Sequence, residues 1–178
     1  MFAIVDIETT GNRYKYGQIT EISIFQHNGL KVTDSYTSLV QPDMDIPCFI
    51  TRLTGITNGM VEQAPKFYEI AKKIVEMTAG RTLIAHNAHF DYKFLQEEFK
   101  RLGYHFNRET ICTVQLSRKY LPGHSSYSLG KLCSDLGISI NGRHRAEGDA
   151  MATVKLFELL LQKHDFQKQK ESARLNLF

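Results

Sequence analysis

The stretch FAIVDIETTG, residues 2–11, decides the fold of this chain of 178 residues. Its β-branched and aromatic composition predicts a strand over Phe2–Glu8. Side chains in a strand alternate between its two faces, so Asp6 and Glu8 continue a row of apolar side chains that begins at Phe2. Acidic side chains are uncommon on a face that packs into a core. The end of this strand is therefore a candidate functional site.

The segments after this strand predict an α/β fold with a central mixed sheet. Ile19–Gln26 and Leu30–Val40 also have strand composition, and the turn at Asn28-Gly29 between them favours three antiparallel strands at the start of the chain. Thr82–Ala85 adds a strand that leads into a helix. The expected helices flank the sheet at residues 48–55, 65–80, 88–102, 128–136 and 147–163. The segment 110–120 fits either a strand or a helix.

Length and composition predict one domain over residues 1–163, followed by a polar tail or linker over residues 164–178. Lys and Arg total 22 against 19 Asp and Glu, so the net charge of +3 says little about partners. The three cysteines form no CxxC pair, which favours a reducing, cytoplasmic location. No apolar stretch approaches the roughly 18 residues needed to span a bilayer, so we expect no membrane contact.

Two further carboxylates fall on faces that should point into the core. Asp91 precedes Phe94 and Leu95 by one helical turn, and Asp149 shares a helical stripe with Leu156. Unpaired carboxylates on buried faces cost several kcal/mol each, or they become protonated. No Lys or Arg occupies a matching inward position, and a set of oxygen ligands is what Mg²⁺ or Mn²⁺ prefers. The four acids therefore predict bound divalent metal.

His144 precedes Asp149 by five residues, in the loop that enters the same helix. An imidazole titrates near neutral pH, so this side chain is suited to take a proton from an attacking water molecule. Two metal ions about 4 Å apart stabilise the attacking and leaving oxygens of a displacement at phosphorus. We therefore expect displacement at phosphorus with His144 as the general base.

The motifs DIETTG, HNAHFDY and HRAEGDA, which begin at Asp6, His86 and His144, resemble in order and spacing those of the DEDDh exonuclease superfamily, which includes the proofreading epsilon subunit of bacterial DNA polymerase III. The resemblance covers roughly residues 1–163. It implies a ribonuclease-H-like fold, two Mg²⁺ or Mn²⁺ ions, and release of nucleoside 5′-monophosphates from the 3′ end of single-stranded or frayed DNA. It implies that the metal ligands are Asp6, Glu8, Asp91 and Asp149, and that His144 is the general base. Arg145 stands where the companion family has tyrosine, which favours the histidine subtype.

Other residues match family segments that contact the substrate. The resemblance implies that the backbone at Thr9, Thr10 and Gly11 meets the terminal nucleotide, that Leu53 and Ile56 contact the last base, and that His86, Asn87 and Phe90 line the site. Structural explanations stay open for several of them. Leu53 and Ile56 also suit the core of a short helix, His86 suits a structural role, and Asn87 could cap the helix that follows it.

Alternative functions and partners also stay open. An exonuclease that trims RNA fits the same motifs, because no motif fixes the choice of sugar. An inactive binding module that recruits a polymerase or a sliding clamp is a different class, which the five intact motif positions disfavour. The ending RLNLF, residues 174–178, is similar to peptides that dock on the bacterial sliding clamp, although a chance match explains it as well.

Overall fold

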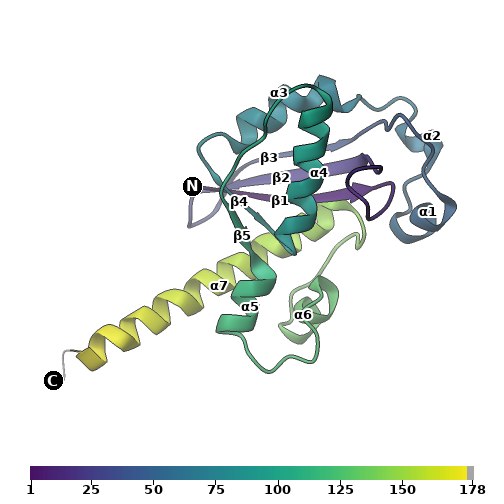
Figure 1. The fold of residues 1–178 in the computed structure, drawn as a ribbon. Helices are drawn as coiled ribbons and strands as arrows, with labels where there is room; N and C mark the ends of the chain where they lie inside the picture. Colours follow the sequence, from purple (N-terminus) through teal and green to yellow (C-terminus); the bar gives the residue numbers. More distant parts are fainter. Residues whose placement is uncertain (176–178) are drawn as a thin grey trace.

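A five-stranded mixed sheet forms the centre of the protein (Figure 1). The computed structural model describes the backbone of residues 1–175 and the side chains of residues 1–164. The strand order is β3-β2-β1-β4-β5. The strands are β1 (Phe2–Thr9), β2 (Ile19–His27), β3 (Val32–Leu39), β4 (Thr82–Ala85) and β5 (Thr110–Cys112). The prediction of an α/β fold around a mixed sheet is confirmed.

Strand pairing divides the sheet into two parts that meet at β1. β2 pairs antiparallel with β1 and with β3, whereas β4 pairs parallel with β1 and with β5. Gly29, with φ of 97°, makes the tight turn between β2 and β3 that antiparallel neighbours allow. The parallel strands need longer connections, which the helices supply. β1 therefore lies inside the sheet, and its side chains meet a layer of helices on each face.

Helices cover both faces of the sheet (Figure 1). One core cluster joins Ala3 and Val5 of β1 to Ile74 and Phe94 from two of the helices. A second cluster joins Ile4, on the opposite face, to the C-terminal helix. The helices are α1 (Cys48–Thr54), α2 (Asn58–Val61), α3 (Phe67–Thr78), α4 (Ala88–Arg101), α5 (Thr113–Tyr120), α6 (Leu129–Asp135) and α7 (Ala146–Leu175). Thus α3 and α4 cover one face and α7 covers the other, the face that carries Asp6 and Glu8.

The sequence prediction is wrong for the length of α7. We expected the helix to end at Lys163, but α7 continues to Leu175 (Figure 1). Residues 164–175 lose the apolar stripe, but most of them are good helix formers and none is Gly or Pro, so nothing stops the helix. Of the possible clamp motif 174–178, residues 176–178 lie outside the described part of the chain. Among the described helices, none combines the length and apolarity needed to cross a membrane.

The ambiguous segment 110–120 contains both kinds of element. Thr110–Cys112 forms β5 beside β4, and Thr113–Tyr120 forms α5 directly after it. The strand has only three residues, too few for a periodic pattern to separate it from the first turn of the helix. α5 packs against α7, which connects this part of the chain to the C-terminal helix.

Candidate functional site

Asp6 and Glu8 lie in the last half of β1, on the face that α7 covers. Both side chains are half-buried. In the pairing with β2, Asp6 is opposite Ser23 and Glu8 is opposite Glu21. The predicted row of side chains is therefore present, and it brings three carboxylates together on two neighbouring strands.

Asp91 reaches the same place from the other layer of the protein. It lies in the first turn of α4, directly after β4, and is 4% exposed. The parallel pairing of β1 with β4 ends at Ile4, so the edge of β1 beyond that point is open to α4. Burial raises the pKa of Asp91 to about 8, and hydrogen bonds from the backbone N–H groups of Asp91 and Ile7 oppose this rise.

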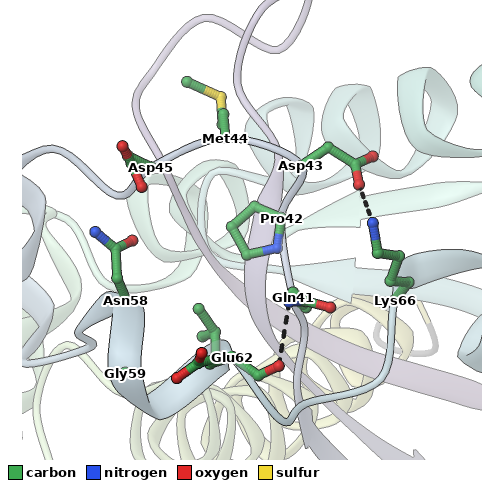
Figure 2. Close-up of a pocket in the computed structure, with 10 residues that line it drawn as sticks. Gln41, Pro42, Asp43, Met44, Asp45, Asn58, Gly59, Glu62 and Lys66 are labelled. Carbon is green, nitrogen blue, oxygen red and sulfur yellow. Dashed lines mark hydrogen bonds and ion pairs between the residues drawn. The ribbon is translucent and has the colours of Figure 1, made fainter.

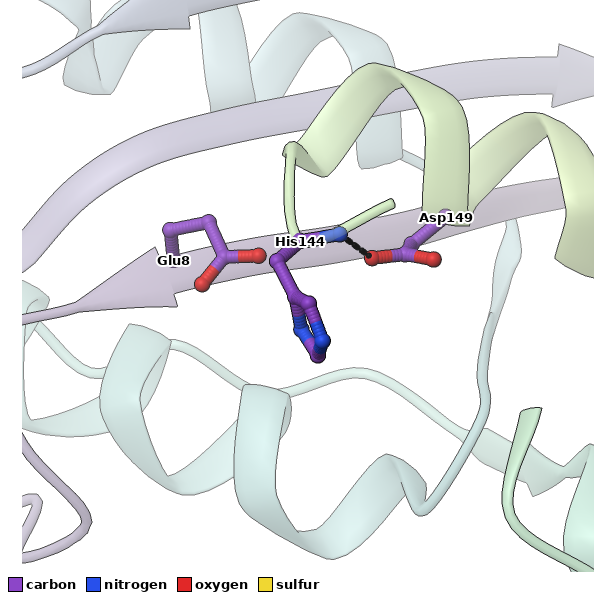
Figure 3. A group of neighbouring side chains, drawn as sticks. All are labelled: Glu8, His144 and Asp149. Carbon is purple, nitrogen blue, oxygen red and sulfur yellow. Dashed lines mark hydrogen bonds between the residues drawn. The ribbon is translucent and has the colours of Figure 1, made fainter. Parts of the chain in front are cut away.

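Asp149 and His144 enter from the first turn of α7 and the loop before it. The backbone N–H of His144 donates to Oδ2 of Asp149 at 2.8 Å, and the imidazole extends away from the helix (Figure 3). Ligand atoms of Glu8, His144 and Asp149 all lie within 4.8 Å of one another. His144 has φ of 60°, a left-handed conformation that is uncommon for a residue with a side chain.

The carboxylates repel one another in a poorly solvated site. The pKa of Asp6 is raised well above its ordinary value by burial, and further by Asp91, Asp149 and Glu8. Burial, Asp149 and Glu21 raise the pKa of Glu8 to about 7, while Arg145 lowers it. Burial also raises the pKa of Asp149. Among the fully described residues, no ion pair involves these four acids, so several carboxylate oxygens converge there without a paired cation.

This arrangement fits divalent metal. A site with oxygen ligands and several negative charges is what Mg²⁺ and Mn²⁺ bind, and a bound cation would offset the burial and the repulsion that raise the pKa values. Glu8, Asp149 and His144 are close enough to share one ion, and Asp6 and Asp91 adjoin them electrostatically. The structure thus brings together all five residues that the sequence predicted for the catalytic centre.

Sequence reasoning missed an ion pair at the edge of the site. Glu21 is 2% exposed and accepts hydrogen bonds from the guanidinium of Arg145, with Oε1 2.6 Å from Nη2. It also accepts a hydrogen bond from the backbone N–H of Ala146 at 2.8 Å. Glu21 did carry a signal, because it interrupts an apolar strand on the same face as Phe25. Its partner lies more than a hundred residues away, where local periodicity gives no information.

The segment Thr9–Gly11 forms a turn that its own side chains stabilise. The hydroxyl of Thr9 donates to the carbonyl of Gly11 at 2.8 Å, and the hydroxyl of Thr10 accepts from the backbone N–H of Gln18 at 3.0 Å. Both threonines are buried. Their side chains thus shape the loop next to Glu8. Only the backbone of this segment is then available for the predicted contact with a nucleotide.

Leu53 and Ile56, the two predicted apolar contacts, occupy different environments. Leu53 lies on α1 and is 53% exposed, so it is available to a ligand. Ile56 is 0% exposed and packs in a small core with Ile46, Ile50 and Val61. The burial of Ile56 argues against the predicted contact with a base, because that contact would require the small core to open.

His86, Asn87 and Phe90 lie around the start of α4. Nδ1 of His86 is 3.0 Å from the hydroxyl of Thr113, and its Nε2 is 2.8 Å from the carbonyl of Tyr127. Burial lowers the pKa of His86, so this side chain connects structural elements as a neutral imidazole. Asn87 is exposed, with φ of 72°, and its side chain makes no capping hydrogen bond. Phe90 is half-buried with its ring beside Phe94.

A cavity of about 710 Å³ lies elsewhere, between the loop after β3 and α2 (Figure 2). Its lining includes three acids, Asp43, Asp45 and Glu62, together with Lys66, which pairs with Asp43. None of the motif residues lines it. An acidic lining repels phosphate groups, so we assign no nucleic-acid strand to this cavity.

Comparison with known proteins agrees with this geometry. The exonuclease family named RNase_T matches residues 3–157. The chain belongs to this family of exonucleases. Its relatives include the 3′-5′ exonuclease DinG of Staphylococcus haemolyticus, which is 36% identical over 165 residues, covering 92% of this chain and 18% of the relative. The PolC-type DNA polymerase III of Caldanaerobacter subterraneus subsp. tengcongensis is 36% identical over 162 residues, covering 91% of this chain and 12% of the relative.

Solved structures of exonucleases share the fold. Exonuclease X, in complex with 5′ overhanging duplex DNA, has a TM-score of 0.75 and 28% identity, with coverage of 91% of this chain and 92% of that one. Escherichia coli exonuclease I, in complex with a dT13 oligonucleotide, has a TM-score of 0.82 at 17% identity, with coverage of 95% and 42%. The chain spans less than a fifth of the DinG and PolC-type relatives, but nearly the whole of exonuclease X.

Proposed function

We propose that this chain is a metal-dependent 3′-5′ exonuclease that hydrolyses the terminal phosphodiester bond of single-stranded or frayed DNA and releases nucleoside 5′-monophosphates. The convergence of Asp6, Glu8, Asp91, Asp149 and His144 supports this proposal. The four carboxylates come from three separate elements, with His144 in the loop before α7, and they have no cationic partner among the described ion pairs. Family membership supplies the class of reaction.

The four carboxylates are proposed to hold two ions of Mg²⁺ or Mn²⁺. When bound, these ions would neutralise the acids and stabilise charge on the attacking and leaving oxygens of the phosphodiester. Asp6 would be one of the ligands, because burial raises its pKa and Asp91, Asp149 and Glu8 raise it further. The rigid β1 strand holds Asp6 and Glu8, and the first turns of α4 and α7 hold the other two acids. These elements fix the ligand geometry before metal arrives.

His144 is proposed to accept the proton of the attacking water molecule. The hydrogen bond from its backbone N–H to Asp149 places the imidazole beside the metal ligands, and the left-handed backbone directs it away from α7. The side chain is half-buried, so it can exchange the proton with solvent after each turnover. A neutral imidazole is the form that accepts a proton.

DNA is the proposed substrate, with RNA as the alternative. The relatives above 25% identity include a DNA polymerase and an exonuclease solved with duplex DNA, and this favours DNA. A DNA polymerase is correspondingly a proposed partner. An inactive binding module is disfavoured because it would gain nothing from a buried cluster of repelling acids. A role in replication or repair, and docking on a sliding clamp, would follow from such a partner.

A time course with 3′-labelled and 5′-labelled oligonucleotides of DNA and RNA, with and without chelator, tests the proposal. We expect metal-dependent release of mononucleotides from the 3′ end, faster for DNA. His144→Ala and Asp149→Ala should each lower the rate by about 10²-fold or more, the usual effect of removing a general base or a metal ligand. Full activity in either variant would overturn the assignment of the site. Faster cleavage of RNA would select the alternative substrate.

A further inference from the structure

The loop that carries His144 is attached to β2 by one buried carboxylate. Glu21 accepts hydrogen bonds from Nε and Nη2 of Arg145, with the shortest distances 3.0 and 2.6 Å. Its Oε2 also accepts from the backbone N–H of Ala146 at 2.8 Å. Hydrogen bonds between ionised groups, and above all bidentate ones from arginine, are stronger and more directional than neutral ones. Glu21 therefore fixes the two residues that directly follow His144.

His144 itself needs such support. Its left-handed φ of 60° is disfavoured for a residue with a Cβ atom, so the surrounding contacts must select it. On one side, the N–H of His144 donates to Asp149 at 2.8 Å. On the other side, the attachment of Arg145 and Ala146 to Glu21 prevents the loop from relaxing. The orientation of the imidazole depends on both contacts.

Glu21 is unsuited to act as a further metal ligand. It faces Glu8 directly across the β1–β2 pair, where two like charges destabilise a sheet unless a cation separates them. Arg145 supplies that cation, and both carboxylate oxygens of Glu21 are occupied by donors from Arg145 and Ala146. The contacts of Glu21 thus point toward the loop and not toward the metal site.

We propose that Glu21 is a positioning residue that acts through Arg145 and the backbone of Ala146 to hold His144 in its reactive orientation. This inference rests on the proposed exonuclease function, because it concerns the general base of that reaction. Loss of the contact should affect the chemical step and leave substrate binding unchanged, since Glu21 is buried and its contacts lie within the protein.

Kinetics of Glu21→Gln and Arg145→Gln test the proposal. We expect kcat to fall about tenfold or more in each, the effect of losing a charge-assisted hydrogen bond, with KM for the oligonucleotide nearly unchanged. Arg145→Lys keeps the charge and should recover part of kcat. The Arg145 side chain is 41% exposed, so its variants stay informative even if Glu21→Gln folds poorly.

A second background separates positioning from general damage to the fold. In His144→Ala, where no imidazole remains to be oriented, adding Glu21→Gln should lower the residual rate no further. An equal fold loss in both backgrounds, or unchanged kcat in Glu21→Gln, would overturn the proposal. Glu158→Gln is the matched control. Glu158 also joins α7 to β2, because its Oε1 lies 3.0 Å from Nε2 of His27, but His27 is at the opposite end of β2 from Glu21. Glu158→Gln should leave kcat unchanged.

Amide hydrogen exchange gives a readout that does not depend on activity. The N–H of His144 is hydrogen-bonded, so its exchange should be about tenfold faster or more in Glu21→Gln and unchanged in Glu158→Gln. If the unmodified protein released no mononucleotides, the proposed function would fail, and exchange would still test the contact. Equal exchange of His144 in Glu21→Gln and the unmodified protein would show that Glu21 does not hold the loop.

Discussion

Asp91 is a carboxylic acid that is 4% exposed, and burial raises its pKa to about 8 from an ordinary value of 3.8. The folded, metal-free protein therefore binds more protons than the unfolded chain between about pH 4 and pH 8. Glu8 acts in the same direction, with a pKa of about 7. The free energy of unfolding that these residues contribute is highest at acid pH and is lost as the pH rises through that window.

We accordingly expect the metal-free protein to melt at a lower temperature at pH 8 than at pH 6, because burial disfavours the ionised carboxylates and they repel one another in the folded state. Thermal unfolding in the presence of chelator over this pH range measures the slope of the melting temperature against pH. Asp91→Asn, which removes one of the titrating groups, should flatten it, whereas Asp34→Asn, at an exposed acid on β3, should not. An unchanged slope in Asp91→Asn would contradict the electrostatic account of the site.

Gly148 permits a close contact that any side chain would block. A Cβ atom there would lie 2.0 Å from the carbonyl oxygen of Asn141 and 2.5 Å from that of Gly142. The loop before His144 thus packs directly on the first turn of α7. We expect Gly148→Ala to displace this loop, to lower kcat about tenfold or more, and to lower the free energy of unfolding by about 1–3 kcal/mol. Oligonucleotide kinetics and urea unfolding measure the two effects.

Gly59→Ala is the control for this substitution. Gly59 lies in α2, where the nearest atom to an added Cβ is 3.9 Å away, an ordinary contact. Replacement by alanine should leave kcat unchanged and alter stability by no more than about 1 kcal/mol. If Gly148→Ala left kcat and the free energy of unfolding unchanged, as Gly59→Ala should, the loop would accommodate a Cβ atom despite its close contacts.

Residues of the site were predictable where they broke a periodic pattern. Asp6, Glu8, Asp91 and Asp149 each occupy an inward position of a strand or helix, and the structure brings them together. Contacts between distant segments were not predictable in this way. The pairing of Glu21 with Arg145 depends on how α7 docks on β2, which a single sequence does not reveal.

At the scale of elements, α1 and the residues just after it place two apolar side chains, Leu53 and Ile56, in different surroundings. Leu53→Ala removes an exposed side chain, so we expect a higher KM for the oligonucleotide with stability nearly unchanged. Ile56→Ala removes a side chain that is 0% exposed, so the free energy of unfolding should fall by about 2–5 kcal/mol. Kinetics and chemical unfolding of both variants measure the contrast. An unchanged KM in Leu53→Ala would remove this residue from the substrate site.

Element boundaries were predicted well where a specific residue ends the element. Gly55 and Gly103 follow α1 and α4 with positive φ, and the Thr57 hydroxyl caps α2 by accepting from the N–H of Met60. The end of α7 was missed because residues 164–175 contain no such stop. The assignment of the domain to residues 1–163 and of a tail to 164–178 stays a prediction.

For the whole molecule, metal binding should stabilise the fold by mass action. A cation that binds only the folded protein adds about 2.7 kcal/mol at a hundredfold excess over Kd. We therefore expect Mg²⁺ or Mn²⁺ to raise the melting temperature measured at pH 8, where the carboxylates are ionised. Asp6→Asn should lose most of this increase. An equal increase in Asp6→Asn would show that the ions bind elsewhere.

The site also has a consequence for the synthesis of the protein. Asp6 and Glu8 are translated well before His144 and Asp149, which lie just before and within α7, the helix that packs across β1 and β2. No incomplete chain that lacks α7 can assemble the four carboxylates. A ribosome-bound chain would therefore lack the proposed catalytic centre until almost the entire domain had been made.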